Sequence, residues 1–390
     1  MSKPKIRFKG YEEDWEQRKL SEIATMHARI GWQNLRTSEF LDSGDYMLIT
    51  GTDFEDGTIN YSTCHYVEKE RYEQDKNIQI RNGSILITKD GTLGKVAYVQ
   101  GLTMPATLNA GVFNVEIKDK KETDEKYLFQ YLKAPFLMDY VTRHATGGTI
   151  KHLNQSILIN FPVYMPKKSE QEKIGLYLMQ LDSLITLHQR KCEETKKLKK
   201  YMLQKMFPQN GKRVPEIRFA GFTDDWEQRK LSDVVDSVDT GKSKFDKEGS
   251  SGEYPILGST SVIGYDDEYD YEGDFILTAR VGANAGSLYR YAGKVKISDN
   301  TVFIQASQNI EFLYQLLIRF DIKRLSFGTG QPLVKASELK RLELMMPTDM
   351  EEQMRIGVYF KNLDHLITLH QRKYEELQKI KKFMLQNMFI

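Results

Sequence analysis

The chain has 390 residues, of which 40% are apolar and 28% charged, so it is long enough for two or three domains with sizeable cores. Its net charge is only +2, which excludes a uniformly basic coat protein, so that a nucleic-acid surface would require local clustering of cations. The opening residues lack the apolar core of a secretory signal, and no run approaches the ~18 apolar residues of a membrane helix. The two cysteines, Cys64 and Cys192, form no metal-binding motif. We therefore expect a cytoplasmic protein without membrane contact.

The chain opens with a segment that it later repeats. Residues 4–23 read PKIRFKGYEEDWEQRKLSEI, and residues 215–234 read PEIRFAGFTDDWEQRKLSDV, with 13 of 20 positions identical. Because the same segment precedes two dissimilar regions, we expect it to belong to a structural frame that both halves of the chain have in common. Trp15 and Trp226 are expected to anchor each globular region to the long helices, with the EQRK residues at the surface.

The region after the first copy shows short β patterns bounded by turn residues. Strands are predicted within YMLITG (46–51), SILITKDGTLGKVAYV (84–99) and GVFNVEI (111–117). A short helix is predicted over 124–143. Together these patterns indicate a mixed α+β domain.

Two long helices are predicted from a second, stronger repeat. Residues 170–207 and 352–389 match at 25 of 38 positions, and no Pro or Gly interrupts 176–206 or 358–388. About 35 helical residues would span about 50 Å. Apolar residues recur every seven, with Leu178, Ile185, Phe360 and Ile367 as an extra flank, which predicts a coiled coil. The predicted seam consists of Ile174, Leu181, Leu184, His188, Leu198 and Met202 with Ile356, Leu363, Leu366, His370, Leu377 and Met384.

The second middle region follows the plan of the first. Strands are predicted at YPILGS (254–259), DFILTARVGANAGSLYRY (274–291) and TVFIQA (301–306), with a helix over 309–324. In both regions a strand is followed by a basic residue, Lys89 or Arg280, and then by a glycine-containing loop. A common scaffold with different loops is expected where the loops carry specificity.

The fold class predicted is α+β, with two mixed domains separated by an antiparallel two-helix coiled coil in a pseudo-two-fold tandem duplication. The predicted boundaries are 1–165 and 208–347 for the domains and 166–207 and 348–390 for the helices. The antiparallel arrangement follows because each opening repeat would then continue from the end of a helix.

No catalytic or metal-binding motif emerges from the sequence. DTGKS (239–243) lacks the first glycine of a phosphate loop, because Asp236 occupies that position. The seven histidines show no metal spacing, and we expect Asp182, Asp364 and the KKLKK run (196–200) to be solvated parts of the helices.

The whole arrangement resembles the specificity (S) subunit of type I restriction–modification enzymes. The resemblance is carried by DWEQRKLSEI and DWEQRKLSDV, by the GTLG and GANAG loops, and by LDSLITLHQRK and LDHLITLHQRK. It implies that the two domains are target recognition domains that each read half of a bipartite asymmetric target in double-stranded DNA. It also implies that the helices set the gap and dock two methyltransferase (M) subunits. Restriction (R) subunits would join through that M–S core.

The same resemblance implies that the chain binds no cofactor, since S-adenosylmethionine, ATP and Mg²⁺ would belong to the partner subunits. The candidate DNA-binding residues are polar or basic and lie in or near the loops, because cations suit phosphates and Arg, Asn and Gln suit base edges. They are Lys89, Thr92, Lys95, Arg143, Lys151 and His152 in the first domain and Arg280, Asn284, Arg290, Arg324, Gln331 and Lys335 in the second. The main alternative is a coiled-coil scaffold whose globular domains bind proteins.

Overall fold

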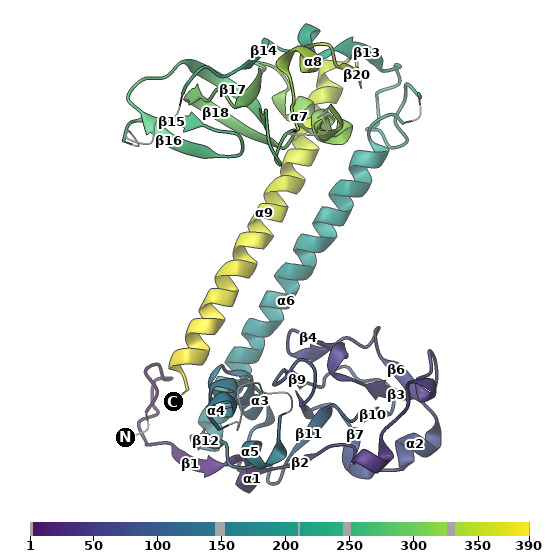
Figure 1. The fold of residues 1–390 in the computed structure, drawn as a ribbon, viewed down its shortest axis with the longest axis vertical. Coiled ribbons are helices and arrows are strands. Elements are labelled where there is room, and N and C mark those ends of the chain that lie inside the picture. The colour runs from purple at the N-terminus through teal and green to yellow at the C-terminus, as the bar shows by residue number, and fades with distance from the viewer. Residues whose placement is uncertain (1–2, 145–152, 210, 245–250, 326–331, 390) are drawn as a thin grey trace. The chain divides into compact units, whose positions relative to one another are not determined.

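The structure, a computed structural model, describes residues 3–144, 153–209, 211–244, 251–325 and 332–389. The chain divides into two compact units: unit 1 comprises Met1–His188 and Lys373–Ile390, and unit 2 comprises Gln189–Arg372. Helices α6 (Lys168–Lys205) and α9 (Met350–Asn387), the two long helices of Figure 1, each contribute a stretch to both units. Each unit therefore holds one mixed α+β domain together with part of each long helix.

Unit 1 contains two four-stranded sheets, in which the predicted apolar runs form central strands. The first sheet has the order β2 (Ala24–His27), β11 (Val112–Ile117), β8 (Ile85–Thr88), β9 (Val96–Tyr98). The second has the order β6 (His65–Val67), β3 (Tyr46–Ile49), β10 (Ala106–Leu108), β7 (Gln79–Ile80). A hairpin of β4 (Phe54–Glu55) and β5 (Thr58–Ile59) turns through Asp56 and Gly57, with φ of 50° and 89°. Short helices α1 (Leu20–Ile23), α2 (Lys69–Glu73) and α5 (Gln155–Leu158) connect these strands.

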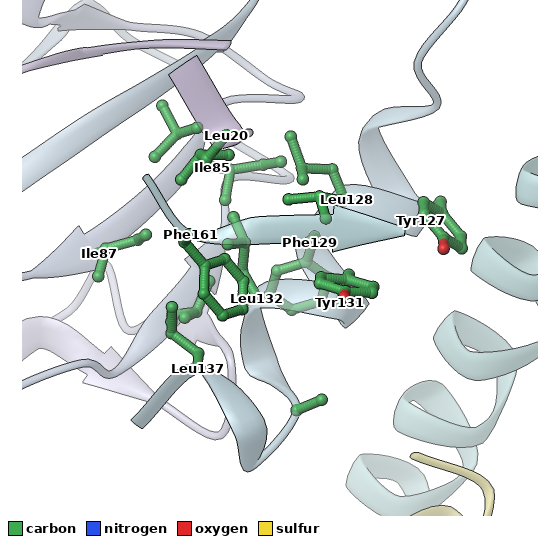
Figure 2. Packing of buried hydrophobic residues seen from close by; sticks show 14 of the residues in the cluster. Leu20, Ile85, Ile87, Tyr127, Leu128, Phe129, Tyr131, Leu132, Leu137 and Phe161 are labelled. Carbon is green, nitrogen blue, oxygen red and sulfur yellow. The ribbon is translucent and has the colours of Figure 1, made fainter. Parts of the chain in front are cut away.

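The single helix predicted over 124–143 is two helices, so that prediction was wrong in its extent. Helix α3 (Glu125–Lys133) begins where the Asp124 carboxylate accepts a hydrogen bond of 2.8 Å from the Tyr127 N–H. Helix α4 (Phe136–His144) begins after Pro135, which disfavours helical backbone at the residue before it. Figure 2 shows the resulting core, where the Leu128 and Leu132 side chains lie among side chains from other elements, including Leu20 and Phe161.

Unit 2 contains one six-stranded sheet. Its order is β14 (Ser237–Thr240), β19 (Thr301–Gln305), β17 (Tyr271–Ala279), β18 (Leu288–Ile297), β15 (Tyr254–Leu257), β16 (Val262–Asp266). Against it lie helices α7 (Ile310–Phe320) and α8 (Ala336–Lys340). The helix predicted over 309–324 ends at Phe320, because Asp321 adopts a left-handed φ of 63°, and a 3₁₀ turn (Ile322–Leu325) follows.

The opening repeat forms the same frame in both units. Its EQRK residues are β1 (Glu16–Lys19) and β13 (Glu227–Lys230), and these strands pair antiparallel with β12 (Pro162–Met165) and β20 (Glu343–Met346). Trp15 and Trp226 are buried beside these strands, with exposed fractions of 3% and 1%. The Trp226 ring lies 5.9 Å from that of Phe207, immediately beyond α6, and the Trp15 ring lies 6.1 Å from that of Tyr127 on α3.

The IRF residues of the repeat connect the end of one long helix to the start of the other. In unit 1 the Ile6 N–H donates to the Asn387 carbonyl of α9 at 2.9 Å, and Arg7 pairs with Glu170 of α6 at 2.7 Å. In unit 2 the Ile217 N–H donates to the Lys205 carbonyl of α6 at 2.9 Å. Arg218 there forms two hydrogen bonds to Glu352 of α9, at 2.7 and 2.8 Å. We call the two IRF segments, residues 6–8 with Arg7 and residues 217–219 with Arg218, the clasps.

Within each unit the two long helices run antiparallel, as predicted. In unit 1 the start of α6, including Ile174, shares a core with the end of α9, including Leu385. In unit 2 the end of α6, including Met202, packs against the core that holds the start of α9, including Ile356. The prediction of α+β domains with paired helices is therefore confirmed for each unit.

The seam of the helix pair differs from the predicted one. Leu184, Leu198 and Leu366 point to solvent, with exposed fractions of 42%, 44% and 41%. The buried positions advance by four and then three residues, whereas the prediction advanced by three and then four. Leu178 and Phe360, predicted as a flank, are fully buried. Of the remaining predicted positions, Ile174, Leu181, Ile356, Leu363 and Leu377 are buried, whereas His188, Met202, His370 and Met384 are half-buried.

Asp182 and Asp364 are not simply solvated, which corrects another expectation. Asp182 is paired with Lys381, and Asp364 is paired with Lys199, whose Nζ lies 2.6 Å from its Oδ1. Lys199 belongs to the KKLKK run, so that run is not wholly a solvated face.

Among the described residues, no helix is long and apolar enough to cross a membrane, and no group of three or more His, Cys, Asp or Glu could hold a metal ion. Both cysteines are free and buried.

Candidate nucleic-acid interface

The two basic residues that follow a strand are held by the same pair of backbone hydrogen bonds. Lys89, after β8, donates its N–H to the Gly111 carbonyl at 2.8 Å and accepts from the Leu153 N–H at 2.8 Å. Arg280, after β17, donates to the Asn300 carbonyl at 3.0 Å and accepts from the Val334 N–H at 2.8 Å. The two positions are therefore structurally equivalent, and each begins a glycine-containing loop.

The loop of unit 1, residues 89–95, is fixed at its base and open at its tip. The Lys95 N–H donates to the Thr88 hydroxyl at 3.0 Å, and the Gly94 N–H donates to the Thr88 carbonyl at 2.9 Å. Gly94 has a φ of 70°, which favours glycine. The Thr92 and Lys95 side chains are exposed, whereas the Lys89 ammonium lies 5.5 Å from the centre of the Phe113 ring.

The loop of unit 2, residues 280–287, packs against a second basic segment. A Cβ on Gly286 would lie 2.8 Å from the Lys323 backbone nitrogen, so only glycine permits this close approach. This contact brings the loop beside Arg324, whose side chain is 70% exposed. The hydrogen bond from Val334 to Arg280 brings Lys335, also exposed, to the base of the same loop. Arg280, Asn284, Arg324 and Lys335 thus come from segments that meet at one place.

The sequence matches the family described as Type I restriction modification DNA specificity domain over residues 12–197 and 223–379. The chain belongs to this type I specificity family. It is 24% identical over 409 residues to the MjaVIII specificity subunit of Methanocaldococcus jannaschii, covering 94% of both chains. A putative MjaX specificity subunit of the same organism is 24% identical over 401 residues, covering 95% of this chain and 91% of the relative.

A solved structure shows the same fold. The crystal structure of the type I S subunit from M. genitalium matches 100% of this chain and 99% of its own, with a TM-score of 0.72 at 17% identity. The resemblance expected from the sequence and the predicted fold class are both confirmed, and the chain is a DNA-recognition subunit of a type I restriction–modification system. The alternative of a protein-binding scaffold loses its support, since the family match covers both domains.

One residue of this specificity subunit that was predicted to contact DNA, Arg290, interacts instead with other residues of its own domain. Arg290 on β18 forms an ion pair with Glu311 of α7 and stacks 5.1 Å from the centre of the Tyr314 ring. Burial would raise the pKa of Glu311, but hydrogen bonds from Arg290 and Lys361 hold it below its usual value. Glu311 is therefore ionised at neutral pH and holds the Arg290 side chain, and we do not place Arg290 in the interface.

Of the other predicted DNA-contact residues, the structure describes some and not others. Arg143 lies exposed in the last turn of α4, where its Nε donates to the Asp139 carbonyl at 3.1 Å. Lys151, His152 and Gln331 lie outside the described residues. Sequence reasoning missed Lys323, which is exposed beside Arg324, although the adjacent Lys–Arg pair was a visible signal.

Proposed function

We propose that each domain reads one half of a bipartite, asymmetric target in double-stranded DNA, and that the two helices set the gap between the halves. The observation that carries this proposal is the contrast between a common frame and unlike loops. Lys89 and Arg280 are tethered identically, yet the loops that follow them differ in sequence and length. Equivalent placement with different side chains suits two half-sites of different sequence.

The roles of the side chains follow from their chemistry. Exposed cations such as Lys95, Arg324 and Lys335 suit phosphates, which position a protein on the duplex without reading its sequence. Asn284 and Arg280 suit adenine and guanine edges in the major groove. These assignments, with Thr92 and Arg143, form the interface that we propose.

A binding measurement tests this reading. The chain, reconstituted with its M subunits, is expected to bind a duplex with both half-sites more tightly than duplexes with either half scrambled. Each mismatched base pair typically costs about 1 to 3 kcal/mol. The affinity should also fall steeply with salt, because phosphate contacts release counterions. Equal, salt-insensitive binding to scrambled DNA would contradict the proposal.

We further propose that the long helices dock two M subunits, and that R subunits join through this core. Leu176 and Leu184 are exposed on α6 in unit 1, with fractions of 49% and 42%. Val358 and Leu366 occupy the equivalent positions on α9 in unit 2, with fractions of 47% and 41%. Exposed large apolar side chains on a helix are candidates for contact with a partner, and a pair of them that recurs at equivalent positions suits two copies of one partner.

The chemistry would then reside in those partners. We propose that this chain carries no catalytic site and acts in the cytoplasm, where its DNA is found. S-adenosylmethionine, ATP and Mg²⁺ would bind the M and R subunits.

Charged substitutions on these docking surfaces should change the stoichiometry of the complex. We expect Leu176→Glu with Leu184→Glu to lower the affinity for one M subunit by at least about tenfold, because a charge would be buried at the interface. Val358→Glu with Leu366→Glu should do the same for the other copy. Native mass spectrometry would show one M subunit per chain in each case.

The matched control is Lys200→Glu, which also changes charge on an exposed position of α6 but lies on another face. It should retain two M subunits. Two M subunits bound to all the Leu and Val variants would show that the docking surface lies elsewhere.

A further inference from the structure

A polar junction in unit 1 connects the recognition domain to both long helices. Asp182 of α6 accepts a hydrogen bond of 2.7 Å from the Gln130 Nε2 on α3 and is paired with Lys381 of α9. Lys133 of α3 lies 3.4 Å from the same carboxylate and donates to the Asp56 carbonyl, in the β4–β5 turn, at 2.9 Å. Gln130 is fully buried, and the Lys381 side chain is only 8% exposed.

The same junction recurs in unit 2. Asp364 of α9 accepts a hydrogen bond of 3.0 Å from the Gln315 Nε2 on α7, and another of 2.6 Å from the Lys199 Nζ on α6. Gln315 is 1% exposed, and the Lys199 and Asp364 side chains are 15% and 38% exposed, so this ion pair is less buried than that of unit 1. In each unit, therefore, a domain helix supplies Gln, the long helix that follows the domain supplies Asp, and the other long helix supplies Lys.

The junction of unit 1 keeps its charges despite burial. Burial, together with the charge of Lys133, lowers the pKa of Lys381 to about 8 against the opposing effect of Asp182. Burial would raise the pKa of Asp182, but Lys133 and Lys381 hold it below its usual value. At neutral pH the pair is thus ionised, and its hydrogen bonds are charge-assisted and directional.

Neither the buried ion pair of unit 1 nor the partly exposed pair of unit 2 is a strong source of stability. Replacing a buried pair with apolar groups of similar size is often neutral or stabilising, because desolvation offsets the attraction, and an exposed pair contributes at most about 1 kcal/mol. In well-studied helix pairs a buried polar group fixes the register of the helices, because its hydrogen bonds can form in only one alignment. Two copies of a three-element junction therefore point to alignment rather than to stability.

We propose that the residues of the two junctions are positioning residues, namely Gln130–Asp182–Lys381 in unit 1 and Gln315–Asp364–Lys199 in unit 2. They fix the angle and axial position of each recognition domain on its stretch of the helix pair. They thereby set how strictly the complex discriminates the gap between the half-sites. This inference rests on the proposed function and deepens it. The junction residues contact no DNA; they act through the domains that they hold.

The test uses the junction of unit 2 in the full chain, reconstituted with its M subunits. The triple variant Gln315→Leu, Asp364→Leu and Lys199→Met replaces the network with apolar groups. The control, Glu193→Leu with Lys196→Met, removes an exposed ion pair of 3.0 Å from α6 in the same unit. Methylation is measured on duplexes whose gap is the cognate one, one base pair shorter or one longer.

The wild-type chain and the control should prefer the cognate gap by roughly tenfold or more, comparable with the cost of a mismatched base pair. The triple variant should methylate all three gaps within about twofold, with an unchanged melting temperature. A wild-type profile in the variant would overturn the inference. A uniform loss at every gap with a lower melting temperature would overturn it too, since that outcome indicates a structural role only.

The charge exchange Asp364→Lys with Lys199→Asp provides a second, conservative variant. Its ion pair is reversed, and the Gln315 amide can turn to present its carbonyl. We expect the strict gap profile to return in this variant, and a relaxed profile would count against the junction. If the wild-type complex itself ignored both half-sites and gap, the proposed function would fail, and this inference with it.

Discussion

Replacing Arg280 with alanine should lower the affinity of the reconstituted complex for its target by about 1 to 3 kcal/mol, which is typical for loss of an Arg contact to DNA. The position begins the glycine-containing loop of unit 2, residues 280–287, and is fixed by two backbone hydrogen bonds, so that the side chain has a defined origin. Lys89→Ala should have an equivalent effect in unit 1. If the lost contact is to a base, only the half-site that the substituted domain reads should lose its sequence preference.

Titration at several salt concentrations identifies the kind of contact that is lost. A phosphate contact would weaken binding to all sequences and reduce the salt slope by about one. A base contact would instead relax the preference at a single base pair. Arg229→Ala is the matched control, because this exposed Arg lies on β13, the strand of the frame that has β1 as its counterpart in unit 1. If Arg280→Ala bound DNA as Arg229→Ala does, the loops would not be the reading surface.

Breaking a clasp should have the largest effect on stability. Arg218→Met leaves Glu352, which is fully buried, without its cation, and removal of one partner from a buried pair typically costs about 3 to 5 kcal/mol. The N-terminal turn of α9 softens this cost, because a carboxylate is favoured there. Arg7→Met should act likewise on Glu170 in unit 1. Urea unfolding followed by circular dichroism measures the loss.

The control for the clasp is Arg355→Met, which removes an exposed pair with Glu351 from the same helix. An exposed pair contributes at most about 1 kcal/mol, so this variant should unfold almost as the wild type does. Equal stabilities for Arg218→Met and Arg355→Met would show that the clasp does not hold the helices together.

Much of the frame was predictable because its sequence segments occur twice in the chain. The duplicated EQRK and LDxLI segments indicated the parts that both units share, and the alternating apolar runs identified central strands. The break at Pro135 was also readable, since proline disfavours helix at the preceding residue. These signals depend only on residues that are neighbours in the sequence, so they can be recognised without the tertiary structure.

The seam and the junctions were harder to predict, for physical reasons. Leu184 and Leu366 were assigned to the seam because they are apolar, and hydropathy does not distinguish a buried residue of a helix from an exposed one. The partners of Asp182 and Arg290 come from distant parts of the chain, Lys381 and Glu311. Such pairings depend on tertiary structure and leave no periodic trace.

Reading of a bipartite target by the two domains can be tested by mapping every methylated adenine in the genome of a host that carries this chain with its M subunits. We expect one bipartite asymmetric sequence with a fixed gap. We also expect that exchanging residues 89–95 or 280–287 for those of another specificity subunit alters only the corresponding half. Methylation without a bipartite consensus, or a consensus in which either exchange altered both halves, would show that the two domains do not each read one half.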